Sequence, residues 1–211
     1  MKKPSWTPKG LANALTILRI CIIPFLLMLF MRGYHRAETA HGGAAWFYLG
    51  ALALFGIAAL TDHLDGRIAR KRGVTDFGKF ADPIADKLLI LGTLFAFKYW
   101  GGLIPLWMFL VMALREVGVT ALRSALVARG GRVISASQWG KYKTGSQIAV
   151  VTLSIALLAV NSAGLRVGGV QGAHGPIFWM MLFPMTLTVV SGVEFLYNNR
   201  TQLRNLTSAR G

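Results

Sequence analysis

Long apolar runs alternate with shorter polar segments along the chain. A helix needs roughly 20 residues to cross a bilayer core of about 30 Å. Six runs approach or exceed this length, over about residues 12–32, 44–66, 80–99, 103–128, 145–161 and 176–197. Aromatic residues lie near several of their ends, as membrane-interface anchors do: Trp46, Tyr99, Trp100, Trp107 and Tyr197. The pattern predicts an all-α, polytopic integral membrane protein with six transmembrane helices.

The connecting segments differ strongly in positive charge. With an even number of spans, both termini lie on one side of the membrane. That side carries seventeen of the lysines and arginines, Arg19 among them, and the opposite loops carry only Arg32, Arg36, Lys98 and Arg166. Because cytoplasmic loops hold the excess of Lys and Arg, we expect both termini in the cytoplasm.

The composition agrees with a membrane protein and excludes some other classes. Charged residues make up 15% of the chain and hydrophobic ones 54%, whereas an ordinary soluble domain has about 25% charged residues. The net charge of +15 suits an anionic lipid surface. Nucleic-acid binding has no separate soluble domain to carry it. Cys21 is the single cysteine, which excludes a disulfide framework within the chain and a thiolate zinc site.

Five of the eight acidic residues fall within residues 61–87. Asp62 and Asp65 are three residues apart at the end of the second run, and Asp82 and Asp86 are four apart at the start of the third. Each pair shares a helix face, and the short connection around residues 70–74 makes the two helices antiparallel neighbours. Four carboxylates are therefore expected to meet near the membrane surface. Solvated cap residues, the alternative, account for one or two aspartates but poorly for two helical pairs.

The chemistry around these carboxylates indicates a metal and a phosphate. Converging anions need a cation, and oxygen ligands without a His or Cys cluster favour Mg²⁺ or Mn²⁺ over zinc. Gly66 and Gly78 allow a close backbone approach, and Arg70 lies one turn beyond Gly66. A guanidinium beside a metal site suits phosphate. Together these residues predict phosphoryl-group chemistry.

A second group of cations follows later in the chain. Arg115 and Arg123 are eight residues apart and share a helix face, with Glu116 as a neutralising partner for Arg115. Lys141 and Lys143 come before the fifth run. Charge in the loops explains the lysines moderately well, but it explains Arg115, deep in an apolar run, poorly. We expect these four cations to bind an acceptor phosphate.

Two motifs carry a family resemblance. The first reads Asp62-x-x-Asp65-Gly66-x-x-Ala69-Arg70, then seven residues, then Gly78-x-x-x-Asp82-x-x-x-Asp86. The second is NALTILR, from Asn13 to Arg19. This pattern resembles the signature of the CDP-alcohol phosphatidyltransferases, and residues 115–123 and 140–147 resemble the corresponding segments of its phosphatidylglycerophosphate synthases. His63, where an aromatic residue is frequent, and Ser124, where many relatives carry Glu, depart from the pattern.

The resemblance implies a fold, a reaction and roles for residues. It implies that the chain is a membrane transferase of phospholipid biosynthesis, which moves the phosphatidyl group of CDP-diacylglycerol to glycerol 3-phosphate and releases CMP. Residues 1–211 would form one transmembrane catalytic domain, with a cytoplasmic segment over about 1–10 and a basic tail over about 198–211. A homodimer in a bacterial inner membrane, with a cytoplasmic active site, is expected.

The implied roles divide the candidate residues into four groups. A pair of Mg²⁺ or Mn²⁺ ions would be held by Asp62, Asp65, Asp82 and Asp86. Asp86 would also be the catalytic base. CDP-diacylglycerol would contact Asn13, Thr16, Gly66, Arg70, Asp76 and Gly78, although a helix cap explains Asp76 nearly as well. The acceptor phosphate would bind Arg115, Arg123, Lys141 and Lys143.

Three alternatives remain open at this point. The same family includes enzymes with other acceptors: phosphatidylglycerol in cardiolipin synthesis, serine, or inositol phosphate. Intramembrane prenyltransferases also use aspartate-rich helices and Mg²⁺, but their motifs lack the Gly-x-x-Ala-Arg connection. A cation or proton transporter would distribute its carboxylates through the bilayer; here only Glu116 and Glu194 lie away from the aspartate cluster and the outer loop.

Overall fold

The computed structural model describes residues 8–39, 42–72, 76–128, 138–165, 170 and 175–202, and side chains within them for 13–39, 42–62, 84–128, 139–165, 170 and 175–202. The described residues form six helices and no strand. The helices are α1 (Pro8–Glu38), α2 (Ala44–Arg72), α3 (Asp76–Tyr99), α4 (Leu106–Ala128), α5 (Gln138–Ser162) and α6 (Pro176–Asn198). The predicted all-α class and the six predicted elements are confirmed.

Most helices continue beyond the apolar run that predicted them. Lys141 and Lys143, expected before the fifth span, lie inside α5, and Arg70, expected in a connection, lies in α2. The apolar runs mark where a helix meets lipid, whereas the backbone hydrogen bonds that define the helix continue through polar residues. The sequence pattern therefore underestimated the helix lengths.

Four helices are long and apolar enough to cross a membrane, judged over the described residues by length and composition: α1, α2, α5 and α6. α4 is long enough, but it carries Arg115, Glu116 and Arg123 within its length. Large apolar side chains such as Phe25, Leu60, Leu114 and Trp179 are exposed on the outside of the bundle. Contact with lipid rather than water explains that exposure, and the chain is an integral membrane protein.

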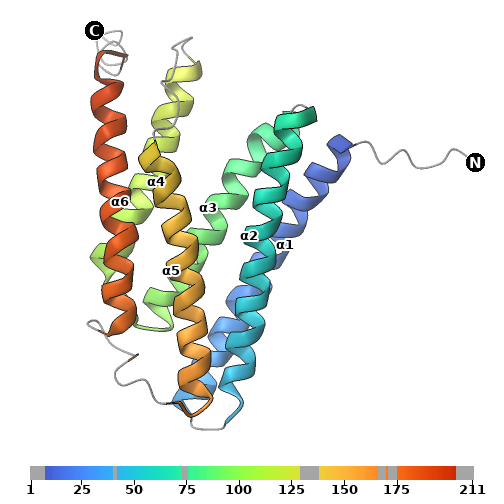
Figure 1. Cartoon of the computed structure of the whole chain (residues 1–211), viewed down its shortest axis with the longest axis vertical. Coiled ribbons are helices and arrows are strands. Elements are labelled where there is room, and N and C mark those ends of the chain that lie inside the picture. Colours follow the sequence, from blue (N-terminus) through green and yellow to red (C-terminus); the bar gives the residue numbers. More distant parts are fainter. Residues whose placement is uncertain are drawn as a thin grey trace, which may run out of the picture.

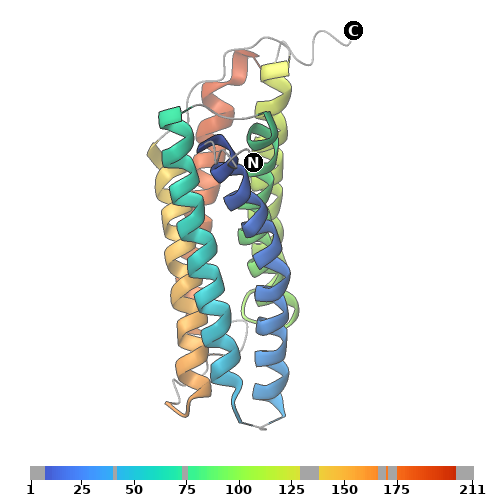
Figure 2. The same cartoon turned by 90° about the vertical axis from the view of Figure 1, so that its right-hand side faces the viewer.

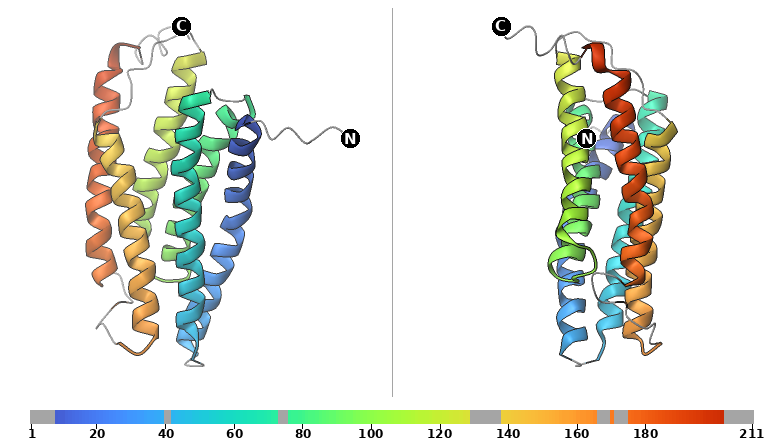
Figure 3. Two further views of the ribbon diagram at one scale, coloured as in Figure 1. Left: turned by 45° about the vertical axis from the view of Figure 1, so that its right-hand side comes forward. Right: turned by 90° about the vertical axis from the view of Figure 1, so that its left-hand side faces the viewer.

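The helices run side by side as an up-and-down bundle (Figure 1 and Figure 2). α1 packs against both α2 and α3, α6 packs against α4 and α5, and α2 packs against α5. Figure 3 shows α4 and α6 side by side, and in both of its views α1 begins and α6 ends at the same end of the bundle. α2 and α3 run antiparallel, as predicted, but they share few contacts because α1 packs against both.

The interior changes character along the bundle axis. Toward the end where α1 meets α2, an apolar core includes Phe30, Tyr48 and Phe97, and the Phe30 ring centroid lies 5.5 Å from those of both partners. Toward the other end, buried polar and charged side chains replace it: Thr16, Arg19, Glu116, Lys143, Gln147, Thr188 and Ser191. Because burying such groups is costly unless they find partners, this end is the candidate for a site.

Candidate functional site

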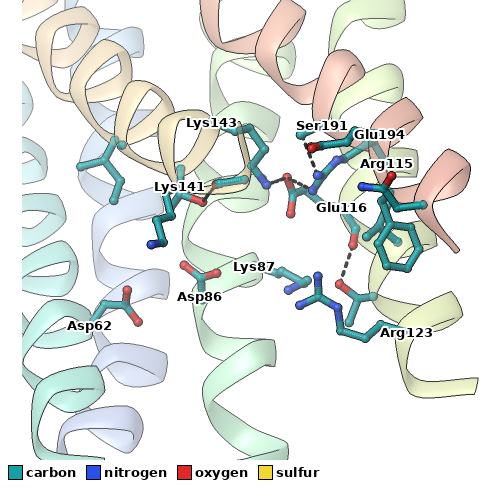
Figure 4. Close-up of a pocket in the computed structure, with 18 of the residues that line it drawn as sticks. Asp62, Asp86, Lys87, Arg115, Glu116, Arg123, Lys141, Lys143, Ser191 and Glu194 are labelled. Atoms are coloured by element: carbon teal, nitrogen blue, oxygen red, sulfur yellow. Dashed lines mark hydrogen bonds and ion pairs between the residues drawn. The ribbon is translucent and has the colours of Figure 1, made fainter. Parts of the chain in front are cut away.

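A cavity of about 730 Å³ opens at the polar end of the bundle, between α2, α3, α4, α5 and α6 (Figure 4). Its lining is rich in charge and contains Asp62, Asp86, Lys87, Arg115, Glu116, Arg123, Lys141, Lys143 and Glu194. Figure 4 shows the carboxylates Asp62 and Asp86 next to Lys141, with Lys143, Arg115 and Arg123 beyond them across the cavity. The cavity therefore brings two of the four predicted carboxylates, Asp62 and Asp86, together with the four predicted acceptor cations.

On the acidic side, Asp62 of α2 and Asp86 of α3 both line the cavity. α2 extends through Asp65 and α3 through Asp82, so the helical spacing assumed for each predicted pair holds. The side chains of Asp65 and Asp82 lie outside the described residues. Among the described side chains, no three His, Cys, Asp or Glu residues gather as a metal-binding group, and the four-carboxylate metal site stays a prediction.

Asp62 has a partner that the sequence analysis missed. Arg19 of α1 is fully buried, and its Nη1 lies 2.9 Å from Asp62 Oδ1. We counted Arg19 with the cytoplasmic loop charges, but it lies inside a membrane-spanning helix. An arginine within an apolar run that also carries a polar motif is a signal that could have identified it. The ion pair ties α1 to the acidic side of the cavity.

On the basic side, Glu116 lies between two cations. Its Oε1 accepts a hydrogen bond from Lys143 Nζ and lies 3.6 Å from Arg115 Nη1. Both Glu116 and Lys143 are buried. The predicted pairing of Glu116 with Arg115 is present, but the closer partner of this carboxylate is Lys143. The low dielectric of a buried site strengthens such an interaction, so Glu116, Lys143 and Arg115 form a rigid part of the cavity wall.

Arg115 also contacts α6, which the sequence analysis did not connect with the site. Its Nη2 donates to Ser191 Oγ at 2.7 Å, and its Nε donates to the Thr188 carbonyl at 3.2 Å. Thr188 Oγ1 in turn accepts a hydrogen bond from Gln147 Nε2 of α5 at 3.3 Å. One hydrogen-bonded network therefore joins α4, α5 and α6 behind the cavity.

The other two predicted acceptor cations are more accessible. Arg123 and Lys141 line the cavity and are exposed, and within the described part of the chain neither forms an ion pair. The Arg123 guanidinium lies 5.7 Å from the centroid of the Phe195 ring. Such an arrangement orients a cation without neutralising it, and an anion could bind here.

The predicted donor-binding residues are only partly described. Asn13 and Thr16 lie on α1, and Thr16 is fully buried one turn before Arg19, but neither lines the cavity. The side chains of Arg70 and Asp76 fall outside the described residues; Gly66 lies within α2 and Gly78 within α3, which begins at Asp76. The polar cavity residues that were not selected from the sequence include Lys87, Ser191, Glu194, Asn198 and Asn199.

Comparison with known proteins supplies the family. The family model described as CDP-alcohol phosphatidyltransferase matches residues 9–192. Over 189 residues, the chain is 40% identical to a "Probable phosphatidylglycerophosphate synthase" of Mycobacterium tuberculosis, covering 89% of this chain and 80% of the relative. It is 35% identical over 198 residues to the CDP-diacylglycerol–glycerol-3-phosphate 3-phosphatidyltransferase of Bacillus subtilis, covering 92% and 97%. A relative of the same name from Pseudomonas fluorescens is 34% identical over 193 residues, covering 87% and 84%. This chain belongs to the CDP-alcohol phosphatidyltransferase family.

Proposed function

We propose that this protein transfers the phosphatidyl group of CDP-diacylglycerol to glycerol 3-phosphate, forming phosphatidylglycerophosphate and CMP. One observation carries the proposal: a single cavity is lined by carboxylates from α2 and α3 and by cations from α4 and α5. A donor pyrophosphate and an anionic acceptor need these two environments side by side. The names of the relatives from Bacillus subtilis and Pseudomonas fluorescens specify the same donor and the same acceptor.

The acidic side would hold divalent cations. Carboxylates from two helices facing one cavity fit Mg²⁺ or Mn²⁺, which prefer oxygen ligands. The proposed ligands of a metal pair are Asp62, Asp65, Asp82 and Asp86. When bound, these ions would neutralise the charge of the donor pyrophosphate and stabilise the departing CMP. The polar groups at Asn13, Thr16, Gly66, Arg70, Asp76 and Gly78 are proposed to bind the rest of the donor.

Asp86 is the proposed base. It would remove the proton from the acceptor hydroxyl, whose oxygen then attacks the phosphorus that bears the diacylglycerol. A new P–O bond forms to glycerol 3-phosphate, and the P–O bond to CMP breaks with its electron pair leaving on CMP. Arg115, Arg123, Lys141 and Lys143 would hold the acceptor phosphate on the opposite side of the cavity. That arrangement brings the hydroxyl and the phosphorus together, which is the main requirement of phosphoryl transfer.

Purified protein tests the reaction directly. With CDP-diacylglycerol and Mn²⁺, we expect CMP release and phosphatidylglycerophosphate formation when glycerol 3-phosphate is added. Parallel reactions contain serine, inositol phosphate or phosphatidylglycerol. Release of CMP with one of these acceptors but not with glycerol 3-phosphate would refute the assignment and identify the acceptor that replaces it.

The orientation in the membrane is a further part of the proposal. Residues 1–211 are proposed to form one catalytic domain of a bacterial inner-membrane protein, a homodimer, with both termini and the cavity facing the cytoplasm. The test starts from Cys21→Ser, because Cys21 is exposed and is the single cysteine. A cysteine placed at Thr39 should react with a membrane-impermeant thiol reagent from outside intact cells. One placed at Thr201 should react only in inside-out vesicles, and the reverse pattern would overturn the orientation.

A further inference from the structure

Three atoms of the Arg115 side chain face three different partners. Nε donates to the Thr188 carbonyl, Nη2 donates to Ser191 Oγ, and Nη1 faces Glu116 Oε1. A guanidinium has five N–H donors in a rigid plane. With three nitrogens directed at protein groups, the orientation of the plane is fixed, and donors are still available for a ligand in the cavity that Arg115 lines.

Ser191 is itself held in place. Its hydroxyl donates to the Thr188 carbonyl at 3.1 Å while its oxygen accepts from Arg115. The hydroxyl hydrogen is therefore directed away from the guanidinium, which leaves a lone pair for Nη2. Ser191 is buried, so water does not compete strongly for this contact. The serine oxygen therefore accepts the hydrogen bond from Arg115 Nη2 in one defined direction.

Gly192 allows the arginine to lie close to the α6 backbone. A Cβ atom at this position would lie 3.2 Å from Arg115 Cγ and 3.6 Å from Nε. The first of these distances is shorter than ordinary carbon–carbon contact, so any side chain here would push the arginine stem away from α6. Glycine is the residue that permits this approach.

We propose that Ser191 and Gly192 of α6 are positioning residues for the acceptor site: they form a seat that holds Arg115 with its remaining N–H donors directed at the acceptor phosphate. The inference rests on the proposed function, because that function assigns the phosphate to this side of the cavity. A seated guanidinium binds more tightly because little of its side-chain freedom remains to be lost on binding. The seat thus extends the acceptor site to a helix that contributes none of the four predicted cations.

The first test is Gly192→Ala. Alanine is a better helix former than glycine, so helix propensity alone would stabilise this variant. Weaker binding of glycerol 3-phosphate must then come from displacement of Arg115. We expect the KM for glycerol 3-phosphate to rise about tenfold, by the same reasoning that makes a 1 Å misplacement costly. The KM for CDP-diacylglycerol should stay within about twofold. Gly118→Ala is the matched control: it lies on α4, three residues from Arg115, and a Cβ there meets no atom within 4 Å.

The second test is Ser191→Ala, which removes the acceptor of Nη2 without adding bulk. Ser154→Ala is its control, because Ser154 is also buried and also donates to a backbone carbonyl of its own helix, at 2.7 Å. We expect Ser191→Ala to raise the KM for glycerol 3-phosphate about fivefold or more, since a hydrogen bond to a charged group is lost. Ser154→Ala should leave both KM values unchanged.

Binding without turnover separates this inference from the proposed reaction. Glycerol 3-phosphate should raise the Tm of the purified wild-type protein, as any ligand of the folded state does. The shift should be clearly smaller in Gly192→Ala and Ser191→Ala than in the two controls. Equal shifts in all variants, no shift in the wild type, or parallel rises in both KM values would overturn the seat. A wild type that binds glycerol 3-phosphate through the seat but releases no CMP would instead refute the proposed reaction.

Discussion

The buried ion pair between Glu116 and Lys143 makes a quantitative prediction about stability. Only 8% of Glu116 and 5% of Lys143 is exposed. Removing one partner of a buried pair leaves the other charge without compensation, at a cost of about 3–5 kcal/mol. For a chain of this size each kcal/mol corresponds to about 2–4 °C in Tm. The Tm of Glu116→Gln should therefore fall by about 6–20 °C, and Lys143→Met should show a similar fall.

The double variant Glu116→Gln with Lys143→Met tests whether the two losses share one cause. Replacing both charges of a buried pair is often neutral for stability, so the double variant should regain most of the Tm lost by either single variant. Arg115 keeps its contacts with Ser191 and Thr188 in every case. The measurement is thermal unfolding in detergent. The control is Glu38→Gln, because Glu38 is exposed and is the last residue of α1, and this change should alter stability by about 0.5 kcal/mol or less.

Two results would refute this reasoning. An unchanged Tm in Glu116→Gln would mean that the carboxylate does not stabilise its neighbours. A double variant whose loss equals the sum of the single losses would mean that the two side chains act independently. Either result would also contradict the conclusion that Glu116 and Lys143 form a rigid part of the cavity wall.

Further predictions concern the two sides of the cavity. In a chelating buffer, Asp62→Asn should lower the Tm because buried Arg19 loses its ion pair with Asp62. Asp86 forms no ion pair in the described part of the chain, so Asp86→Asn should leave the Tm unchanged. Equal falls in Tm would contradict the role of the Arg19 contact. In the transferase assay, Asp86→Asn should lower kcat by about 10²-fold or more, as loss of a general base does, and full activity would exclude Asp86 as the base. Arg123→Ala and Lys141→Ala should each raise the KM for glycerol 3-phosphate about tenfold, the effect of losing a charged hydrogen bond, and leave the KM for CDP-diacylglycerol unchanged. A change in the KM for CDP-diacylglycerol instead would show that these cations bind the donor and not the acceptor.

The sequence predicted the number and order of the helices because bilayer thickness sets a length that apolar runs must match. It also predicted that the aspartates of the second and third helices converge, because helical spacing and a short connection constrain where side chains can meet, and Asp62 and Asp86 do line one cavity. The predicted ends of the helices were wrong at the polar side: Lys141 and Lys143 were expected before the fifth helix and lie inside it. A hydrophobic pattern detects contact with lipid, and these lysines lie in a helical turn that faces the cavity.

Other features depend on tertiary contacts whose partners the sequence does not specify. The place of Arg19 in an apolar run signals a partner, but that this partner is Asp62 follows only from the packing of α1 on α2. Ser191 and Gly192 are small residues of the kind that many membrane helices use for close packing, and nothing else in the sequence distinguishes them. The contact of Ser191 with Arg115 joins positions 76 residues apart in the chain. Such a contact depends on which helices pack against each other in the folded bundle.

The buried Arg19 also has a consequence for biogenesis. α1 is the most apolar of the four candidate spans, yet it carries an arginine whose partner Asp62 lies where the apolar part of α2 ends. On the insertion scale an arginine at the centre of a membrane helix costs about 2.5–3.5 kcal/mol. Arg19 bears part of this cost while α1 is alone in the bilayer, and its ion pair with Asp62 offsets it once α2 is inserted. We therefore expect the translocon to release α1 and α2 as a pair, so that a helical hairpin closed by a salt bridge forms first.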